Sequence, residues 1–386
     1  MERYFVKDSQ KEILSKAISG NLCLDVPLGF KTYRNARILP QRSPYLSGGV
    51  CDERGVYVKT TSFVENLYDG SYAFGEDEVV IRHKDAVFLG TWYPVYGHAI
   101  TDNIKRLWFL YSEDYKKLKE DAAAQGRDID LVYVYLRGGL ELAGYNKDIL
   151  SASGIDSDSL IRIKEVTQYD NVYIPDSSLI PGENCLRFYT KEFRFIVDMI
   201  CRNCNVDGPF PEKVYLTRTG IKDGKDFGEK TLERLFERRG YSVVSPEKMT
   251  FEQQVALMQH CRSVVSTEGS IAHNALFCKD GTELVILRKT DPFNEYTNLV
   301  NGVKNLNFKY IEANHTKIAR VTWGGHFFLW RTKYLNQYLG EGSKERSRWL
   351  CLLWYRYLWA YYKFEHQTEI QSLKRAVKTL LFWKRK

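Results

Sequence analysis

Residues 213–287 read KVYLTRTGIKDGKDFGEKTLERLFERRGYSVVSPEKMTFEQQVALMQHCRSVVSTEGSIAHNALFCKDGTELVIL, and this stretch decides the fold. Short runs rich in β-branched residues alternate here with runs of helical periodicity. Strands are expected at 213–218, 241–245, 262–266 and 281–287, and helices at 229–240 and 249–261. Alternation on this scale is typical of βαβ units on a parallel sheet.

The turn after the strand at 262–266 carries the clearest functional signal. Its sequence is Ser266-Thr267-Glu268-Gly269-Ser270. A turn that leaves a buried strand and enters a helix lies at the carboxyl edge of a parallel sheet, where ligands of open α/β sheets bind. Gly269 lets the backbone approach a ligand closely, and free N–H groups at a helix start suit a phosphate. The alternative is a routine strand-to-helix turn capped by Ser270.

His98 and Asp102 form a second candidate constellation, four residues apart in the run 92–112. Apolar residues at helical spacing make the buried face of this run: Ile100, Ile104, Leu107, Trp108 and Tyr111. On a helix, His98 and Asp102 share a different face near its start, and Arg106 extends that face by one turn. A carboxylate that fixes one ring nitrogen of a histidine is how a general base is oriented. The alternative is a surface or capping contact.

Together these stretches resemble family 61 glycosyltransferases, which include bacterial capsule and cell-surface polysaccharide enzymes. In the second half the matching pieces are YLTR (215–218), RRGYSVVSPE (238–247), MTFEQQVALMQHCRSVVSTEGSIAHNALF (249–277) and GTELVIL (281–287). In the first half they are Gly97-His98, Asp102 and Arg106-Leu107-Trp108. The chain departs from the family pattern at Glu268-Gly269, where most members carry His-Gly.

The resemblance implies two Rossmann-like α/β domains that face each other across a cleft, the GT-B arrangement. Residues 1–185 would form the acceptor-side domain, 186–325 the nucleotide-sugar domain, and 326–386 a basic, aromatic helical tail. It also implies an inverting transfer of a sugar to a hydroxyl of a glycan acceptor in surface polysaccharide synthesis. His98 would act as general base and Asp102 would orient it.

The expected donor is a nucleotide sugar, UDP-linked, and no metal or other cofactor is expected. Cations and helix N-termini must then stabilise the departing diphosphate. The candidate donor-binding residues are Thr217, Arg218, Lys222, Lys225, Glu268, Gly269, Ser270 and Asn274, with Glu268 accepting from the ribose hydroxyls.

Two Asp-x-Asp triplets suggest a site for a divalent metal. Asp128-Ile-Asp130 comes before its expected strand, and Asp156-Ser-Asp158 lies in a Ser-rich loop. Metal-binding triplets of metal-dependent glycosyltransferases follow a strand instead. We interpret both triplets as solvated turn acids.

Charge is concentrated at the end of the chain. Eleven Lys/Arg and three acidic residues lie within 344–386, so this segment carries the whole net charge of +8 and residues 1–343 are neutral. A neutral body argues against an enzyme that acts on nucleic acid. The run WLCLLWYRYLWAYYKF (349–364) either packs on the body or binds an anionic membrane surface, which aromatic and basic residues suit. The two alternatives have equal support.

The N-terminal residues show no apolar run typical of a signal peptide, and no run reaches the length of a transmembrane helix. The eight cysteines are scattered, and Cys201 and Cys204 are interpreted as core residues. The expected location is the cytoplasm, peripheral on the inner face of the cytoplasmic membrane. A non-catalytic sugar- or nucleotide-binding partner in a polysaccharide-assembly complex is the alternative function.

Overall fold

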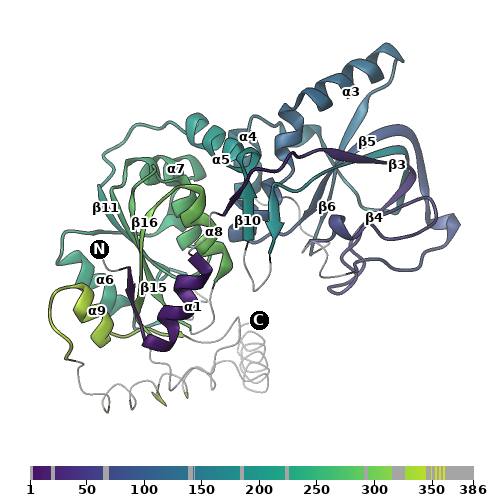
Figure 1. The fold of residues 1–386 in the computed structure, drawn as a ribbon. Coiled ribbons are helices and arrows are strands. Elements are labelled where there is room, and N and C mark those ends of the chain that lie inside the picture. The colour runs from purple at the N-terminus through teal and green to yellow at the C-terminus, as the bar shows by residue number, and fades with distance from the viewer. Residues whose placement is uncertain are drawn as a thin grey trace, which may run out of the picture.

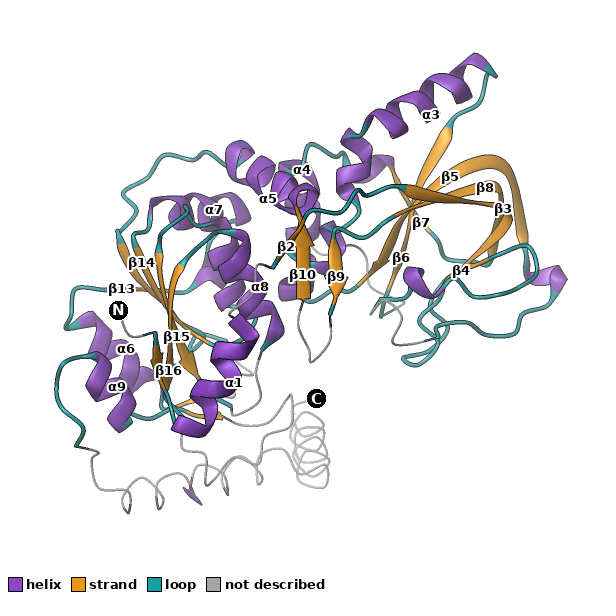
Figure 2. Ribbon diagram, viewed as in Figure 1, coloured by secondary structure: helices purple, strands orange, loops and turns teal. Residues whose placement is uncertain are grey.

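The computed structural model describes residues 3–18, 22–63, 69–137, 142, 144–182, 187–221, 226–290, 294–314 and 327–344, and residues 349, 353, 356, 357 and 360. These residues form two lobes, each built around one six-stranded sheet (Figures 1 and 2). A small sheet of β2 (Cys23–Leu24), β10 (Arg187–Thr190) and β9 (Leu179–Pro181) lies between them.

The second lobe contains a sheet in which every neighbouring pair is parallel. Its strands in order are β1 (Tyr4–Phe5), β16 (Asn307–Glu312), β15 (Glu283–Arg288), β14 (Ser263–Thr267), β11 (Lys213–Leu216) and β13 (Ser242–Val244). Without β1, the five strands have the order 2-1-3-4-5, a common doubly wound order. The chain reverses its direction across the sheet between β11 and β14, so the ligand site of such a fold lies at their carboxyl ends.

Helices cover both faces of this sheet. One face packs against α5 (Lys191–Asn203), α7 (Phe251–His260), the 3-10 helix η8 (Ala272–Phe277) and α8 (Glu295–Val303). The other packs against α6 (Glu229–Glu237) and α9 (Lys333–Tyr338). Consecutive residues of β14 show why: Val264 belongs to the first core and Val265 to the second, since side chains alternate along a strand. The predicted strands and helices of 213–287 are confirmed.

The first lobe has a mixed sheet. Its order is β4 (Gly49–Cys51), β3 (Phe30–Leu39), β8 (Thr167–Pro175), β5 (Val80–Trp92), β6 (Ile129–Tyr135) and β7 (Leu160–Arg162). The strand β3 runs antiparallel to both of its neighbours, and the remaining pairs are parallel. The longer helices of this region are α3 (Glu113–Ala124) and α4 (Gly144–Ala152). The fold is therefore mixed α/β, and a pair of Rossmann-like domains is not confirmed.

The first residues of the chain lie on the second lobe. Strand β1 pairs with β16, and α1 (Asp8–Ile18) follows it there (Figure 1). Strand β1 thus belongs to the expected first domain, 1–185, by sequence but joins the parallel sheet of the second lobe. The domain boundaries expected from the sequence stay a prediction. A further short pair joins β12 (Asp226–Phe227) to β17 (Phe327–Phe328). Short 3-10 helices are η1 (Lys59–Thr61), η2 (Glu76–Glu78), η5 (Ser157–Ser159) and η7 (Pro246–Lys248).

The sequence misleads at two places in this sheet. The polar run His83-Lys84-Asp85 predicts a turn between two strands, but β5 continues through it with a register shift against β8 between Arg82 and Asp85. The Asp85 carboxylate is satisfied inside the sheet, because Asn171 donates to it at 2.7 Å. Asp130 is not a solvated turn acid: it lies on β6 with 9% exposure and accepts from the Tyr169 hydroxyl at 3.2 Å.

The run 92–112 is broken into three short pieces instead of one helix. They are α2 (Tyr96–Ala99), η3 (Asp102–Ile104) and η4 (Leu107–Tyr111). Thr101 has φ −120° and ψ −78°, which no helix allows, so the chain turns there. Arg106 does not extend the His98 face: its buried guanidinium donates to the carbonyl oxygens of Pro175 at 2.9 Å and Thr60 at 2.6 Å.

In the part of the chain that the structure describes, no helix is long and apolar enough to cross a membrane. Of the predicted tail, 326–386, the structure describes residues 327–344. The basic segment 344–386 lies outside the described residues except at its first residue and five isolated positions. Cys204 is buried in the core and Cys201 packs against it, as predicted. No group of three or more His, Cys, Asp or Glu side chains within the described ranges could hold a metal ion.

Arg106→Met should lower the free energy of unfolding by about 3 kcal/mol, because two buried carbonyl oxygens lose a charged donor. Urea unfolding measures the loss. Arg82→Met is the matched control, since the Arg82 side chain is 44% exposed and its ion pair with Asp130 spans 3.6 Å. The control should change the same quantity by less than about 1 kcal/mol. Equal effects of the two variants would contradict the role given to Arg106.

Candidate active site

His98 and Asp102 are joined by a short hydrogen bond. The distance from His98 Nδ1 to Asp102 Oδ2 is 2.7 Å. A carboxylate only accepts, so Nδ1 carries the hydrogen and the lone pair stays on Nε2. The contact forms across the break between α2 and η3, because the irregular backbone at Thr101 still leaves the two side chains side by side. The predicted pairing of these two residues is therefore present in the structure.

Asp102 is a buried carboxylate with 3% exposure. The hydroxyl of Tyr296, at the start of α8, lies 3.0 and 2.9 Å from its two oxygens, and Arg187 on β10 lies 3.8 Å away. Burial acts to raise the pKa of this carboxyl, but the His98 hydrogen bond and nearby positive charge outweigh burial and hold the pKa below its usual value. Asp102 therefore stays ionised and can orient an imidazole.

Aromatic rings surround the imidazole of His98. The ring centroids of Phe63, Tyr93 and Tyr296 lie 5.0, 5.4 and 5.6 Å from its own, each nearly edge-on. About 30% of the His98 side chain stays exposed. The ring is thus fixed in orientation and still reachable from solvent, as a general base must be.

The two lobes meet directly beside His98. A Cβ added to Gly97 would lie 2.7 Å from Ser270 Oγ and 3.1 Å from His273 Nδ1. Only a glycine at this position lets α2 lie so close to the turn that follows β14. The Tyr96 hydroxyl adds a hydrogen bond of 2.6 Å to Asn274 Oδ1. Ser270 and Asn274, both predicted donor-binding residues, therefore contact the helix that carries His98.

The switch point of the second sheet holds the other predicted residues. Arg218 follows β11, and its half-buried guanidinium has no hydrogen-bond or ion-pair partner among the described residues. Gly269 follows β14 with φ +123°, a conformation that favours glycine. Thr217 is different: it is 2% exposed and its hydroxyl donates to Glu233. Lys222 and Lys225 lie outside the described residues.

Lys289, directly after β15, is a site residue that the sequence analysis missed. Its Nζ lies 3.8 Å from the position of a Cβ on Gly269, and 3.2 and 3.1 Å from the two carboxylate oxygens of Asp226. Burial lowers the pKa of this ammonium, and Asp226 opposes the effect. The signal in the sequence was its place after a third buried strand of the same sheet, since parallel strands end at one edge.

Glu268 is buried beside these charges with 3% exposure. Neither carboxylate oxygen has a hydrogen-bond partner of good geometry among the described residues, although the N–H groups of Lys289 and Asn294 face it. Burial raises the pKa of Glu268, and the charges of Arg288 and Lys289 act against the rise. A buried acceptor of this kind suits a ligand that donates hydrogen bonds.

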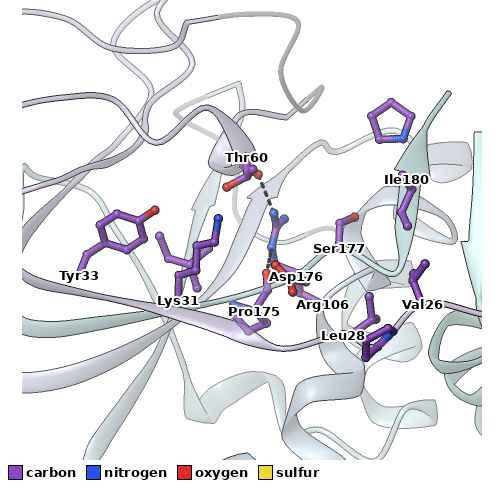
Figure 3. A pocket seen from close by; sticks show the side chains of 13 residues that line it. Val26, Leu28, Lys31, Tyr33, Thr60, Arg106, Pro175, Asp176, Ser177 and Ile180 are labelled. Carbon is purple, nitrogen blue, oxygen red and sulfur yellow. Dashed lines mark hydrogen bonds between the residues drawn. The ribbon is translucent and has the colours of Figure 1, made fainter. Parts of the chain in front are cut away.

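A pocket of about 340 Å³ opens in the first lobe beside Arg106 (Figure 3). Its polar lining comes from Lys31, Tyr33, Thr60, Asp176 and Ser177 and its apolar lining from Val26, Leu28, Ile174 and several prolines. Thr60 lies three residues before Phe63, whose ring packs on His98. One short segment, 60–63, thus contributes a residue to the pocket and another to the surroundings of His98.

Tyr296, Arg187 and His273 were also missed by the sequence analysis. They come from α8, β10 and η8, far from His98 in the sequence. Only the fold brings Tyr296 and Arg187 to Asp102, and His273 to Gly97. The sequence contained one indication, Asn294, which caps α8 by accepting from the N–H groups of Tyr296 and Thr297. This cap determines where α8 begins, but it does not determine which residue Tyr296 contacts.

Comparison with known protein families finds one match. Residues 96–285, just under half of the chain, match the family model described as Glycosyltransferase 61. The matched range begins at α2 and ends within β15, so it includes His98, Asp102 and the turn after β14. No curated protein matches the chain. The family match supports a glycosyltransferase activity.

Glu229, on α6 beside Asp226, gives the second lobe a specific pH dependence. Burial and the Asp226 charge raise the pKa of Glu229 to about 8. The folded state therefore binds a proton that the unfolded state has lost above pH ~4.3, so stability falls as the pH rises from about 4.5 to 8. Glu229→Gln should remove the loss of stability that Glu229 causes over this pH range, and it should raise the Tm at pH 9.

The measurement is Tm against pH from 5 to 9 for the wild type and two variants. Glu237→Gln is the matched control, because Glu237 lies on the same helix and is exposed. Its curve should follow the wild type. A Glu229→Gln curve parallel to the wild type over the whole range would show that Glu229 is ionised in the folded protein.

Proposed function

We propose that this protein is an inverting glycosyltransferase that moves a sugar from a nucleotide-sugar donor to a hydroxyl of a glycan acceptor, in the synthesis of a surface polysaccharide. The observation that carries the proposal is the 2.7 Å hydrogen bond between His98 and the buried Asp102. The family match over 96–285 supports the reaction class. The donor, the acceptor and the base are the parts that we propose.

His98 acts as the general base in this mechanism. With Nδ1 donating to Asp102, Nε2 is the nitrogen that takes the proton of the acceptor hydroxyl as that oxygen attacks the anomeric carbon. The imidazolium that forms is stabilised by the Asp102 carboxylate, which Tyr296 and Arg187 hold in place. A single displacement of this kind inverts the anomeric centre.

The donor diphosphate lies at the carboxyl edge of the second sheet in this proposal. Arg218 supplies a guanidinium that has no partner among the described residues, and Lys289 supplies an ammonium beside Gly269. These cations and the amides of the 269–270 turn stabilise the charge that develops on the leaving diphosphate, and the mechanism requires no divalent metal. Glu268 accepts from the ribose hydroxyls of a UDP-linked donor.

The acceptor lies on the first lobe. Residues 60–63 contribute to the pocket beside Arg106 and to the surroundings of His98, and the prolines and Tyr33 of the pocket offer flat apolar surface beside polar groups. Such mixed surfaces suit sugars, which have hydroxyl edges and apolar faces. The basic tail, 344–386, attaches the enzyme to the inner, anionic face of the cytoplasmic membrane, where a lipid-linked acceptor is available.

A non-catalytic nucleotide- or sugar-binding partner of a polysaccharide-assembly complex is the second candidate. The sequence Glu268-Gly269 favours it, because most members of the family that the chain resembles carry His-Gly there. A screen of nucleotide sugars for release of nucleoside diphosphate separates the two candidates. Release above the uncatalysed rate supports the enzyme.

His98→Ala should lower turnover by a factor of about 10²–10⁴, because the general base is lost, and should leave nucleotide affinity nearly unchanged. The turnover of Asp102→Asn should lie between that of His98→Ala and that of the wild type. His83→Ala is the matched control: His83 faces Asp170 at 3.4 Å but is 85% exposed and lies on the far part of β5. Wild-type turnover of His98→Ala would refute the base assignment.

Arg218→Ala should abolish most of the rise in Tm that UDP produces in the absence of divalent metal, since ligand binding stabilises the native state. Differential scanning fluorimetry with and without Mn²⁺ measures it. Arg262→Ala is the control, because Arg262 precedes β14 at the opposite, amino edge of the sheet and is 78% exposed. A UDP shift that appears only with Mn²⁺ would contradict the metal-independent mechanism.

A further inference from the structure

His273 is a second histidine next to the proposed base, and the mechanism above does not use it. Its side chain is buried, with 5% of the residue exposed, and neither ring nitrogen has a hydrogen-bond partner among the described residues. Most buried polar side chains are paired, and an unpaired one costs about 1–3 kcal/mol, so such a group needs a reason.

The surroundings of His273 place it in the site around His98. Its backbone N–H donates to the Ser270 carbonyl at 3.2 Å, and residues three apart on a 3-10 turn lie on one face. Ser270 Oγ and His273 Nδ1 accordingly both lie against Gly97, the residue before His98. On the other side, the Tyr296 ring lies 5.6 Å from the His273 ring.

His273 is uncharged at neutral pH. Burial, together with the charge of His98, lowers its pKa to about 3, and Asp102 opposes the shift only in part. An uncharged imidazole offers one N–H donor and one nitrogen acceptor, the same pair of functions that a hydroxyl group can match. It also adds no positive charge beside His98, which must itself accept a proton.

Two other roles are less compatible with this geometry. A general base needs a group that orients it. No carboxylate in the described part of the chain bonds to His273, whereas Asp102 bonds to His98. A phosphate ligand favours cations, and the cations of the site, Arg218 and Lys289, lie at the ends of β11 and β15. What remains is an uncharged ligand group that hydrogen bonds.

We infer that His273 binds a sugar hydroxyl of the substrate, next to the hydroxyl that His98 deprotonates. The inference rests on the proposed function and deepens it: the site recognises a sugar with a second hydroxyl close to the reacting one. His273 pairs with that hydroxyl only when the substrate is bound. In the free protein neither nitrogen pairs with a residue that the structure describes.

Three substitutions at His273 test the inference. His273→Phe keeps the ring volume and removes both nitrogens, so turnover in the diphosphate-release assay should fall about 10- to 100-fold. The Tm should stay equal or rise, because an unpaired buried polar group is removed. His273→Asn places an amide near Nδ1 and His273→Gln near Nε2, so one of the two should keep turnover within a few-fold of wild type.

The matched control is His260→Phe, at the exposed end of α7, which should change neither turnover nor Tm. The acidic limb of the pH–rate profile should survive in His273→Phe, because His98 remains the base. Loss of that limb, or wild-type turnover in His273→Phe, overturns the inference. So does a Tm lower by several degrees, a readout that needs no substrate, because it would show a structural imidazole.

The proposed function fails by a different result. If His98→Ala is fully active, the base assignment is wrong whatever His273→Phe does. If the wild type turns over no nucleotide sugar, the enzyme assignment fails. The Tm of His273→Phe still shows whether the buried imidazole destabilises the folded protein for lack of hydrogen-bond partners.

Discussion

Asp102 is a buried carboxylate on which groups from three separate segments converge. His98 reaches it from α2, Arg187 from β10 and Tyr296 from α8. An ionised carboxylate with 3% exposure is stable only where donors and positive charge compensate its lost hydration. The lobes must therefore come together in one arrangement for Asp102 to be satisfied. The same arrangement orients the imidazole of His98, so the stability of the interface and the geometry of the base depend on one group.

The second lobe shows how much of the structure can be predicted from local sequence patterns. The strands and helices of 213–287 follow from periodicity, and the His98–Asp102 contact follows from spacing even though the helix is broken at Thr101. Local patterns do not show which residues, distant in the sequence, a side chain will contact. The places of Tyr296 and Lys289 in the site were therefore missed. They also misled where a polar residue is satisfied inside a sheet: Asp85 and Asp130 read as turn residues, but cross-strand partners hold both in strands.

Charge is also buried at the switch point, before any ligand arrives. Lys289 pairs with Asp226, and the buried Glu268 lies close to Lys289. Removing such groups from water costs free energy, and the core of the doubly wound sheet has to compensate for it. A site whose charges are fixed in advance needs little rearrangement when charge develops on a leaving group. The fixed charges at this edge of the sheet are therefore suited to stabilise a leaving group electrostatically.

The pairing of β1 with β16 has a consequence for how the chain is made. Tyr4 pairs with Tyr310, about 300 residues later in the sequence. At roughly 5–20 residues per second of synthesis, β1 leaves the ribosome about 15–60 s before its partner exists. During that interval the first lobe can form while the opening strand stays unpaired, a segment that a chaperone would recognise. When β16 emerges, β1 pairs with it and becomes the outermost strand on that side of the parallel sheet.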